Sequence, residues 1–442
     1  MKSKTAPHIG RALGPALLAL LALSAAPAGA TDLAFSGFGT LGYTRSDQDY
    51  SYERFVNDAG SAKRDTLLGA QMDARFSPQW GATVQAKLAP AADSDTGWKP
   101  TLAWAFASWR PNNDWLLRAG KLRVPGYMNA ENMDVGATFD YARLPTEMYS
   151  LAPTMDFKGL AASRYWRDDD NELTLEGYWG KADFHWRYHY RESLLDFSQG
   201  AYYMPMEVDK MAGLALTLRR NDDTYRIGYH VGDATRTDAR ILPATFPFVA
   251  LAPGLGYYQT DNRLPGPGLG NNKSLDYQVL YLGADVSLPH DFRVIGEYGR
   301  RKVNRIDIGP SSTSAFVSVL KKIGPWTPYV NYAQLRSSAT QRNLYAAVNG
   351  TQLPPQAAQL LGPEYVALIN AAQRVGADNI SNFDQRAWSV GASYALSATS
   401  KLKAEWSRVR FGQGSSMIDT PPAGPIRNQS MQMLTVAYSV VF

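Results

Sequence analysis

The sequence predicts an all-β fold, a transmembrane antiparallel up-and-down β-barrel of about 16 strands. Three observations lead to it. The chain opens with a secretory segment, its strand-like stretches are joined by alternately short and long connections, and it closes on a strand that ends in the aromatic Phe442. In an up-and-down barrel all the tight turns fall on one rim and all the long loops on the other, and this produces such an alternation.

The N-terminal segment, residues 1–30, has the pattern of a secretory signal peptide. Lys2, Lys4 and Arg11 precede an apolar run at residues 16–26, and small residues follow at positions 28–30. The run is shorter than the roughly 20 apolar residues that a membrane helix needs, and a small-x-small triplet suits a signal peptidase. We therefore expect a signal peptide at residues 1–30 and the barrel at residues 31–442.

The composition excludes several kinds of protein. The chain has 0 cysteines, so disulfides and cysteine-based zinc or thiol chemistry are excluded. Removing residues 1–30 takes three basic residues from the formal charge of +5, and a nearly neutral chain has no general attraction for nucleic acid. No later apolar run is long enough for a membrane helix, whereas barrel strands meet lipid only at every second residue. The 25 tyrosines and 11 tryptophans suit the aromatic girdles of a barrel and equally a sugar-binding protein.

Short polar turns alternate with long connections along the chain. The short turns are rich in strand-breaking residues and lie near Ser77, Arg110, Arg167, Arg219, Leu288, Lys321 and Leu396. The long connections are expected at residues 46–65, 90–98, 123–156, 182–207, 233–273, 304–311, 337–383 and 412–428. The alternating segments that they separate number about sixteen, an even number that lets the last strand pair with the first.

A two-residue alternation assigns the faces of the strands. At the C-terminus the large apolar set is Leu434, Val436, Tyr438, Val440 and Phe442, which we assign to lipid. In other strands the positions between the apolar residues carry charges, for example Asp73, Arg75, Lys87, Arg293, Glu297, Arg301, Lys401, Lys403 and Glu405. Arg or Lys costs about 2–4 kcal/mol at the bilayer midplane, so the interior is predicted to be wet. In the alternative, a soluble sandwich or propeller, these charges would merely be solvated at the surface.

Three stretches resemble the general trimeric porins of the Gram-negative outer membrane. They are "FSGFGTLGY" from Phe35, "WLLRAGKLRVP" from Trp115 and the ending "AYSVVF". The resemblance implies a homotrimer in the cell outer membrane, reached through the periplasm, that passes small hydrophilic solutes or ions by passive diffusion. It also implies lipid and lipopolysaccharide as surroundings and a barrel-assembly machinery that reads Phe442. It implies no cofactor and no catalytic residue.

In that family the third long loop folds into the barrel and narrows it, and here residues 123–156 hold this position. The resemblance implies that acidic loop residues face basic wall residues across the pore and create a transverse field. The candidate pore-lining residues are Glu131, Asp134, Asp140, Arg143 and Glu147 on the loop and Arg75, Lys87 and Arg118 on the wall. Each loop carboxylate could equally be a cap or an ion pair that holds the loop to the wall. The loop aromatics Tyr127, Phe139, Tyr141 and Tyr149 favour a narrower, less polar opening than in the enterobacterial members.

Two other functions remain open at this stage. A substrate-specific channel for a sugar or an aromatic solute would use the same barrel, with binding inside the pore. An outer-membrane barrel enzyme would need a well-placed histidine, but the pair His185 and His189 lacks the helix and the glutamate of a zinc protease, so we expect no metal site. Residues 351–375 have helical spacing and are expected to pack over the mouth or to act as a lid.

Overall fold

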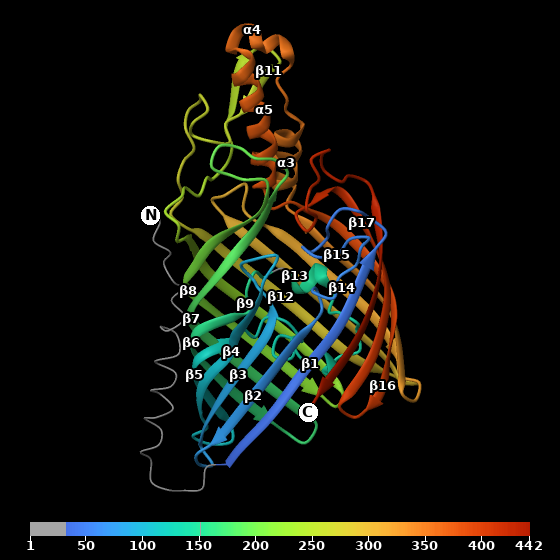
Figure 1. The fold of residues 1–442 in the computed structure, drawn as a ribbon. Coiled ribbons are helices and arrows are strands. Elements are labelled where there is room, and N and C mark those ends of the chain that lie inside the picture. The colour runs from blue at the N-terminus through green and yellow to red at the C-terminus, as the bar shows by residue number, and fades with distance from the viewer. Residues whose placement is uncertain (1–31, 151) are drawn as a thin grey trace, which may run out of the picture.

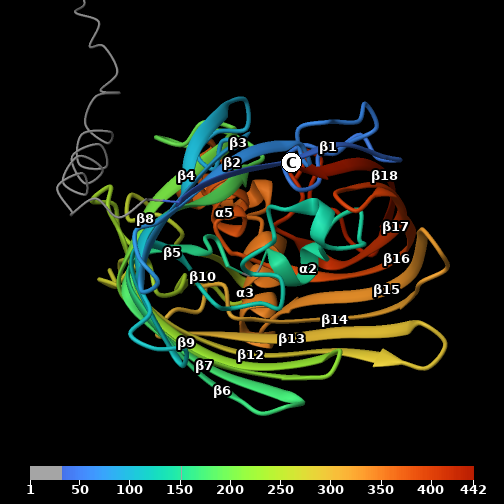
Figure 2. The ribbon, with the colours of Figure 1, turned by 90° about the horizontal axis from the view of Figure 1, so that it is seen from below.

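The computed structural model describes residues 32–150 and 152–442, and the predicted signal peptide at residues 1–30 lies outside them. The chain forms a closed antiparallel barrel of sixteen strands (Figures 1 and 2). The barrel strands are β1 (Asp32–Ser46), β2 (Leu67–Arg75), β3 (Trp80–Pro90), β4 (Trp98–Trp109), β5 (Trp115–Arg123), β6 (Asp156–Arg167), β7 (Asn171–Tyr190), β8 (Gly200–Arg220), β9 (Asp223–Arg236), β12 (Leu275–Leu288), β13 (Phe292–Asn304), β14 (Ser312–Lys321), β15 (Trp326–Ser337), β16 (Phe383–Ser397), β17 (Ser400–Ser415) and β18 (Ser430–Val441).

The last strand closes the ring by pairing with the first. β18 runs antiparallel to β1, with Phe38 opposite Val441. Beyond the strand, the Phe442 N–H donates to the Gly37 carbonyl at 2.9 Å, and the Gly37 N–H donates to the Phe442 carbonyl at 2.7 Å. The fold class predicted from the alternating connections is therefore confirmed, because every strand in the ring has a partner on both sides and no edge is left open.

The seven predicted short turns are all present and share one rim, which we call the short-turn rim. The other rim, the long-loop rim, carries eight connections: L1 (47–66), L2 (91–97), L3 (124–155), L4 (191–199), L5 (237–274), L6 (305–311), L7 (338–382) and L8 (416–429). One predicted loop, 182–207, is wrong over most of its length. β7 continues to Tyr190 and β8 begins at Gly200, because the pairing resumes after the register shift at Gly180/Ala182 while the apolar residues of β7 move from the outward to the inward positions.

Short helices and a hairpin occupy the long loops. They are η2 (Gly136–Thr138) and α2 (Thr146–Tyr149) in L3, β10 (Phe248–Ala252) and β11 (Leu255–Tyr258) in L5, and α3 (Ala339–Gly350), η3 (Pro355–Ala357), α4 (Ala358–Leu361) and α5 (Pro363–Asp378) in L7. Helix is thus confirmed within residues 351–375, and Figure 1 shows it standing above the barrel beside β11. Val366 and Ile369 pack there with Tyr257 and Leu264 in one apolar cluster.

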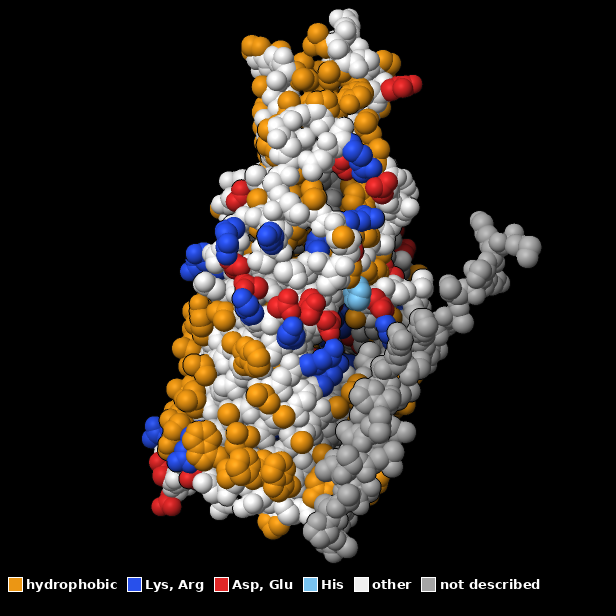
Figure 3. Space-filling view, turned by 90° about the vertical axis from the view of Figure 1, so that its left-hand side faces the viewer, with side chains coloured by type: hydrophobic (Ala, Val, Ile, Leu, Met, Phe, Trp, Pro, Cys, Tyr) orange, Lys and Arg blue, Asp and Glu red, His pale blue; other side chains and the backbone are white. Residues whose placement is uncertain are grey.

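The outer surface of the barrel is an apolar belt. On β18 the side chains of Leu434, Val436 and Tyr438 are exposed, while Thr435 and Ala437 between them are buried, as the alternation predicts. Figure 3 shows apolar side chains gathered over the lower part of the barrel wall, with a row of charged residues above them. Among the described residues, no helix is long and apolar enough to cross a membrane.

Candidate functional site

L3 extends across the interior of the barrel from β5 to the opposite wall. Near its tip, the carbonyl of Gly136 accepts a hydrogen bond from Lys403 Nζ of β17 at 2.6 Å. Further along the loop, the Ala142 N–H donates to the hydroxyl of Tyr329 in β15 at 2.9 Å. The chain then returns to β6 through α2, which Figure 2 shows within the ring of strands.

The tip of L3 fits closely against the wall at Gly136. A side-chain carbon added there would overlap the hydroxyl oxygens of Thr40 on β1 and Ser439 on β18. Only glycine brings the loop backbone this near to the two strands. L3 is therefore anchored at its tip as well as at its two ends.

Asp134 ties L3 to β3 and to the end of β5, from which the loop starts. Its carboxylate accepts hydrogen bonds from Lys87 Nζ at 2.7 and 2.8 Å and from Arg123 Nη2 at 2.8 Å. Burial by itself raises the pKa of Asp134, but the positive charges of Lys87 and Arg123 outweigh it and lower the pKa to about 2. Asp134 is consequently ionised at any physiological pH, and Lys87 is engaged by it.

The other predicted loop residues also meet partners. Asp140 accepts from Lys401 Nζ at 2.7 Å and from the Ser393 hydroxyl at 2.8 Å. Arg143 pairs with Glu53 at 2.8 Å and with Asp65 at 2.5 Å, both in L1. Glu147 accepts from Gln385 Nε2 at 2.8 Å, and its burial raises its pKa. Asp140, Arg143 and Glu147 thus all attach L3 to other parts of the structure.

The loop aromatics form a packed layer with the wall. Tyr127, Tyr149 and Tyr281 are in ring contact, and Tyr149 and Tyr281 both donate their hydroxyl protons to the buried Glu297 at 2.5 Å. The Met128 N–H donates to the same carboxylate at 3.2 Å. The layer joins L3 to β12 and β13, where charged inward residues were expected.

Towards the short-turn rim the interior is polar. One cavity of about 350 Å³ lies beside Arg118, Glu131 and Glu176, and a neighbouring one of about 190 Å³ lies beside Asp140 and Arg293. The two share Thr217, Arg219 and Arg226 in their walls. Arg118 is 3.7 Å from Glu131 and 3.5 Å from Glu176, so positive and negative groups pair along the wall of the cavity.

The structure does not bring all the predicted residues together. Arg75 lies near the short-turn rim, beside a separate cavity of about 420 Å³ with Asp73 and Arg110, and away from L3. The candidate site residues predicted from the sequence do not include Glu176, Arg219 or Arg226. The signal for Arg226 was present, because it lies next to the exposed Tyr225 and Ile227 in a strand that alternates apolar and polar residues.

A network of charged residues crosses the long-loop rim. Arg187 of β7 pairs with Asp95 of L2 at 2.8 Å and with Asp419 of L8 at 2.7 Å, and Asp95 also pairs with Arg54 of L1 at 2.7 Å. Burial alone raises the pKa of Asp95, but the hydrogen bonds from Arg187 and from the Tyr203 hydroxyl outweigh it and lower the pKa to about 2. Because β7 and β17 lie on different sides of the ring, this network, the rim clasp, holds three loops over the mouth.

Arg187→Gln is expected to loosen L8 at neutral pH. Amide hydrogen exchange in residues 416–429 should become about tenfold faster or more, since hydrogen bonds to charged groups contribute about 1.5–3 kcal/mol each. Hydrogen-exchange mass spectrometry measures this. Lys99→Gln is the matched control, because Lys99 pairs with Asp93 of L2 but its side chain is 54% exposed. Equal exchange in the two variants would show that the rim clasp does not order L8.

Three histidines lie on strands β7 and β9. His185 and His189 lie in strand β7 rather than on a helix. His230 is buried, with its Nδ1 atom 3.0 Å from the Tyr178 hydroxyl. Within residues 32–150 and 152–442, no group of three or more His, Cys, Asp or Glu side chains is placed to hold a metal ion.

A closed sixteen-stranded barrel with an apolar outer belt and charged side chains inside has the architecture of an outer-membrane β-barrel, and this places the chain in the outer membrane. No family model and no curated protein matches the sequence. Among solved structures, the anion-selective porin from Comamonas acidovorans is 10% identical, with a TM-score of 0.50 and coverage of 93% of this chain and 100% of that one. Salmonella typhi OmpF, in complex with daunomycin, is 10% identical, with a TM-score of 0.48 and coverage of 93% and 97%. Pseudomonas putida OprB is 7% identical, with a TM-score of 0.46 and coverage of 93% and 94%. At such identities the likeness concerns the fold.

Proposed function

We propose that this chain is a porin, a water-filled channel through which small hydrophilic solutes diffuse passively. The observation that carries the proposal is the polar interior around Arg118, Glu176, Arg219 and Arg226, inside a barrel whose outer face is apolar. Charged side chains at these inward positions are stabilised only where water fills the lumen. No covalent chemistry is part of the proposal.

In this proposal L3 sets the size and charge selection of the channel. The wall residues Lys87 and Arg118 pair with the loop residues Asp134 and Glu131, and Asp140 pairs with Lys401, so the loop contributes the negative charges and the wall the positive ones. Such an arrangement creates a transverse field that orients dipolar solutes. Arg75 acts only near the short-turn exit, and Arg143 and Glu147 hold the loop rather than meet the solute.

The proposal extends to assembly. A homotrimer is inferred from the resemblance of "FSGFGTLGY", "WLLRAGKLRVP" and "AYSVVF" to the general porins. Phe442, with 72% of its surface exposed, is available to a barrel-assembly machinery on the outer face of the ring. Lipid and lipopolysaccharide would surround the apolar belt.

Purified protein in a planar bilayer should conduct, with current steps in groups of three. Lys87→Glu is expected to move the reversal potential towards cation selectivity, because it replaces a positive wall charge beside Asp134 with a negative one. Lys99→Gln removes a positive charge from the long-loop rim and serves as the control, for which we expect little change in the reversal potential. Folded protein that did not conduct would overturn the porin proposal in favour of a closed barrel with enzymatic or adhesive activity.

A further inference from the structure

Five neighbouring strands, β7, β8, β9, β12 and β13, change the character of their inward face halfway along. Towards the short-turn rim the inward side chains are polar or charged: Thr174, Glu176, Thr217, Arg219, Arg226 and Arg293. Towards the long-loop rim the inward side chains are mostly apolar: Phe184, Trp186, Met204, Met206, Val208 and Val279. Part of this apolar face packs against L3, with Met204 and Met206 in one cluster with Tyr127 and Met155.

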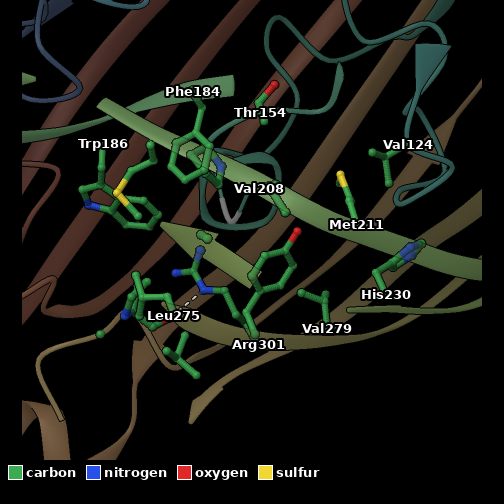
Figure 4. A pocket seen from close by; sticks show the side chains of 18 of the residues that line it. Val124, Thr154, Phe184, Trp186, Val208, Met211, His230, Leu275, Val279 and Arg301 are labelled. Atoms are coloured by element: carbon green, nitrogen blue, oxygen red, sulfur yellow. Dashed lines mark hydrogen bonds between the residues drawn. The ribbon is translucent and has the colours of Figure 1, made fainter. Parts of the chain in front are cut away.

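These apolar side chains line a cavity of about 120 Å³, together with residues of L3 and L6 (Figure 4). L3 contributes Tyr127 and Met155, and L6 contributes Ile306 and Ile308. We call this space the apolar cavity. It lies next to the tyrosine layer at L3, so a molecule held in it would stand at the entrance to the polar interior.

The charged residue in the cavity lining, Arg301, is hydrogen-bonded to the barrel wall and to L6. Arg301 donates through Nε to the Pro310 carbonyl at 2.5 Å and through Nη2 to the Ser312 hydroxyl at 3.2 Å. Its guanidinium lies 5.4 Å from the ring centre of Trp186, which Figure 4 shows beside the cavity. Two of the Arg301 donors are therefore held by the wall, and the rest of the cavity presents rings, thioethers and aliphatic groups.

The size and the lining of the cavity indicate the class of ligand. An apolar cavity of about 150 Å³ in another protein stays dry and binds benzene, so a space of this size suits one aromatic ring. Phe184, Trp186 and Tyr281 offer ring faces and edges. Met204 and Met206 offer flexible thioethers that adapt to the ligand and contact aromatic rings favourably. A cation would lose its hydration there without compensation, and the Nε and Nη2 donors of Arg301 that could meet an anion are engaged by Pro310 and Ser312.

We propose that the apolar cavity is a binding site for a small, uncharged, single-ring aromatic solute that the channel then passes. This inference rests on the proposed porin function and names the substrate class of its pathway. The binding step itself needs only the cavity, so it can be tested without conductance.

The test uses 4-fluorobenzyl alcohol as the probe and fluorine NMR relaxation as the readout, on protein in lipid nanodiscs, with empty nanodiscs to measure partition into lipid. Wild type should show saturable binding, and Met206→Gln should weaken it by about tenfold or more, because a buried amide has no partner in an apolar cavity. Met431→Gln is the matched control, since Met431 is also a buried inward methionine but lies on β18 in a different cluster. Ala234→Leu, which fills the cavity, replaces Met206→Gln if that variant does not fold.

Each outcome decides the inference. Binding that is lost in Met206→Gln or Ala234→Leu and kept in Met431→Gln supports it. Relaxation equal to that of empty nanodiscs, equal affinity in all variants, or displacement of the probe by glucose overturns it. Conductance without probe binding would leave the porin proposal standing and remove the aromatic site. Probe binding without conductance would support the aromatic site and overturn the porin proposal.

Discussion

Gly159→Ala is expected to lower the free energy of unfolding by about 3 kcal/mol, because overpacking in a close-packed region costs about 1–3 kcal/mol and occasionally more. A side-chain carbon at Gly159 would overlap the carbonyl oxygen of Trp179 on the neighbouring strand. That oxygen belongs to the backbone, so no change of rotamer relieves the overlap. Three inward glycines, Gly120, Gly159 and Gly180, lie side by side in the register of β5, β6 and β7. Any shift of β6 is therefore transmitted to both neighbours.

Urea unfolding of the refolded protein in lipid vesicles, followed by the heat-dependent shift in gel migration, measures this loss. Gly296→Ala is the matched control, since a carbon added at Gly296 would meet its nearest neighbour, the Phe316 carbonyl oxygen, at an ordinary 3.4 Å. Gly159→Ala and Gly296→Ala with the same unfolding midpoint would show that the strands at Gly159 separate at little cost.

The fold could be predicted because two of its signals are local. Alternating side chains, such as Leu434, Val436 and Tyr438, report the lipid face without knowledge of any partner strand, and polar turns report the short-turn rim. The boundary of β7 was missed because His185, Arg187 and His189 alternate with large aromatics above the apolar belt. There the contrast is reversed, because Phe184 and Trp186 take the inward positions and the polar residues take the outward ones, so the pattern does not continue that of the lipid-facing part.

The candidate site was predictable only in part, because its contacts depend on how L3 crosses the barrel. The acidic character of the loop was visible in the sequence, but Asp134 meets Lys87 across 47 positions and Asp140 meets Lys401 across 261. No pattern of neighbouring residues in the sequence predicts these two ion pairs. Arg143 was expected to face the pore, but it pairs with two carboxylates of L1. The hydrophobic pattern of the sequence does not predict that L1 lies against L3. The inward apolar residues of β7 and β8 were hidden for a similar reason, since a strand apolar on its inward side reads like one that faces lipid.

Asp134→Asn is expected to release the start of L3 and to shift ion selectivity towards anions. The substitution removes the carboxylate that neutralises Lys87 and Arg123, and Arg123 is almost fully buried, with 3% of its side chain exposed. Breaking a buried pair by removing one partner costs about 3–5 kcal/mol, and we expect the lower end because Arg123 keeps Asp156 at 3.2 Å. Reversal potentials and urea unfolding of the same preparations measure the two effects. Asp93→Asn, whose partner Lys99 is exposed, should change the unfolding free energy by no more than about 1 kcal/mol.

The dependence of this loss on pH separates charge from packing. The folded-state pKa of Asp134 is lowered to about 2, whereas an unperturbed aspartate has a pKa of about 3.9. A depressed carboxyl pKa contributes stability that is fully present above the unfolded-state value and is lost as the pH falls through the folded-state value. The difference in unfolding free energy between wild type and Asp134→Asn should therefore be constant near neutral pH and shrink between about pH 4 and pH 2. A difference that persisted at pH 2 would mean that asparagine disturbs the packing of L3 itself, and the ion pair would then no longer account for the position of the loop.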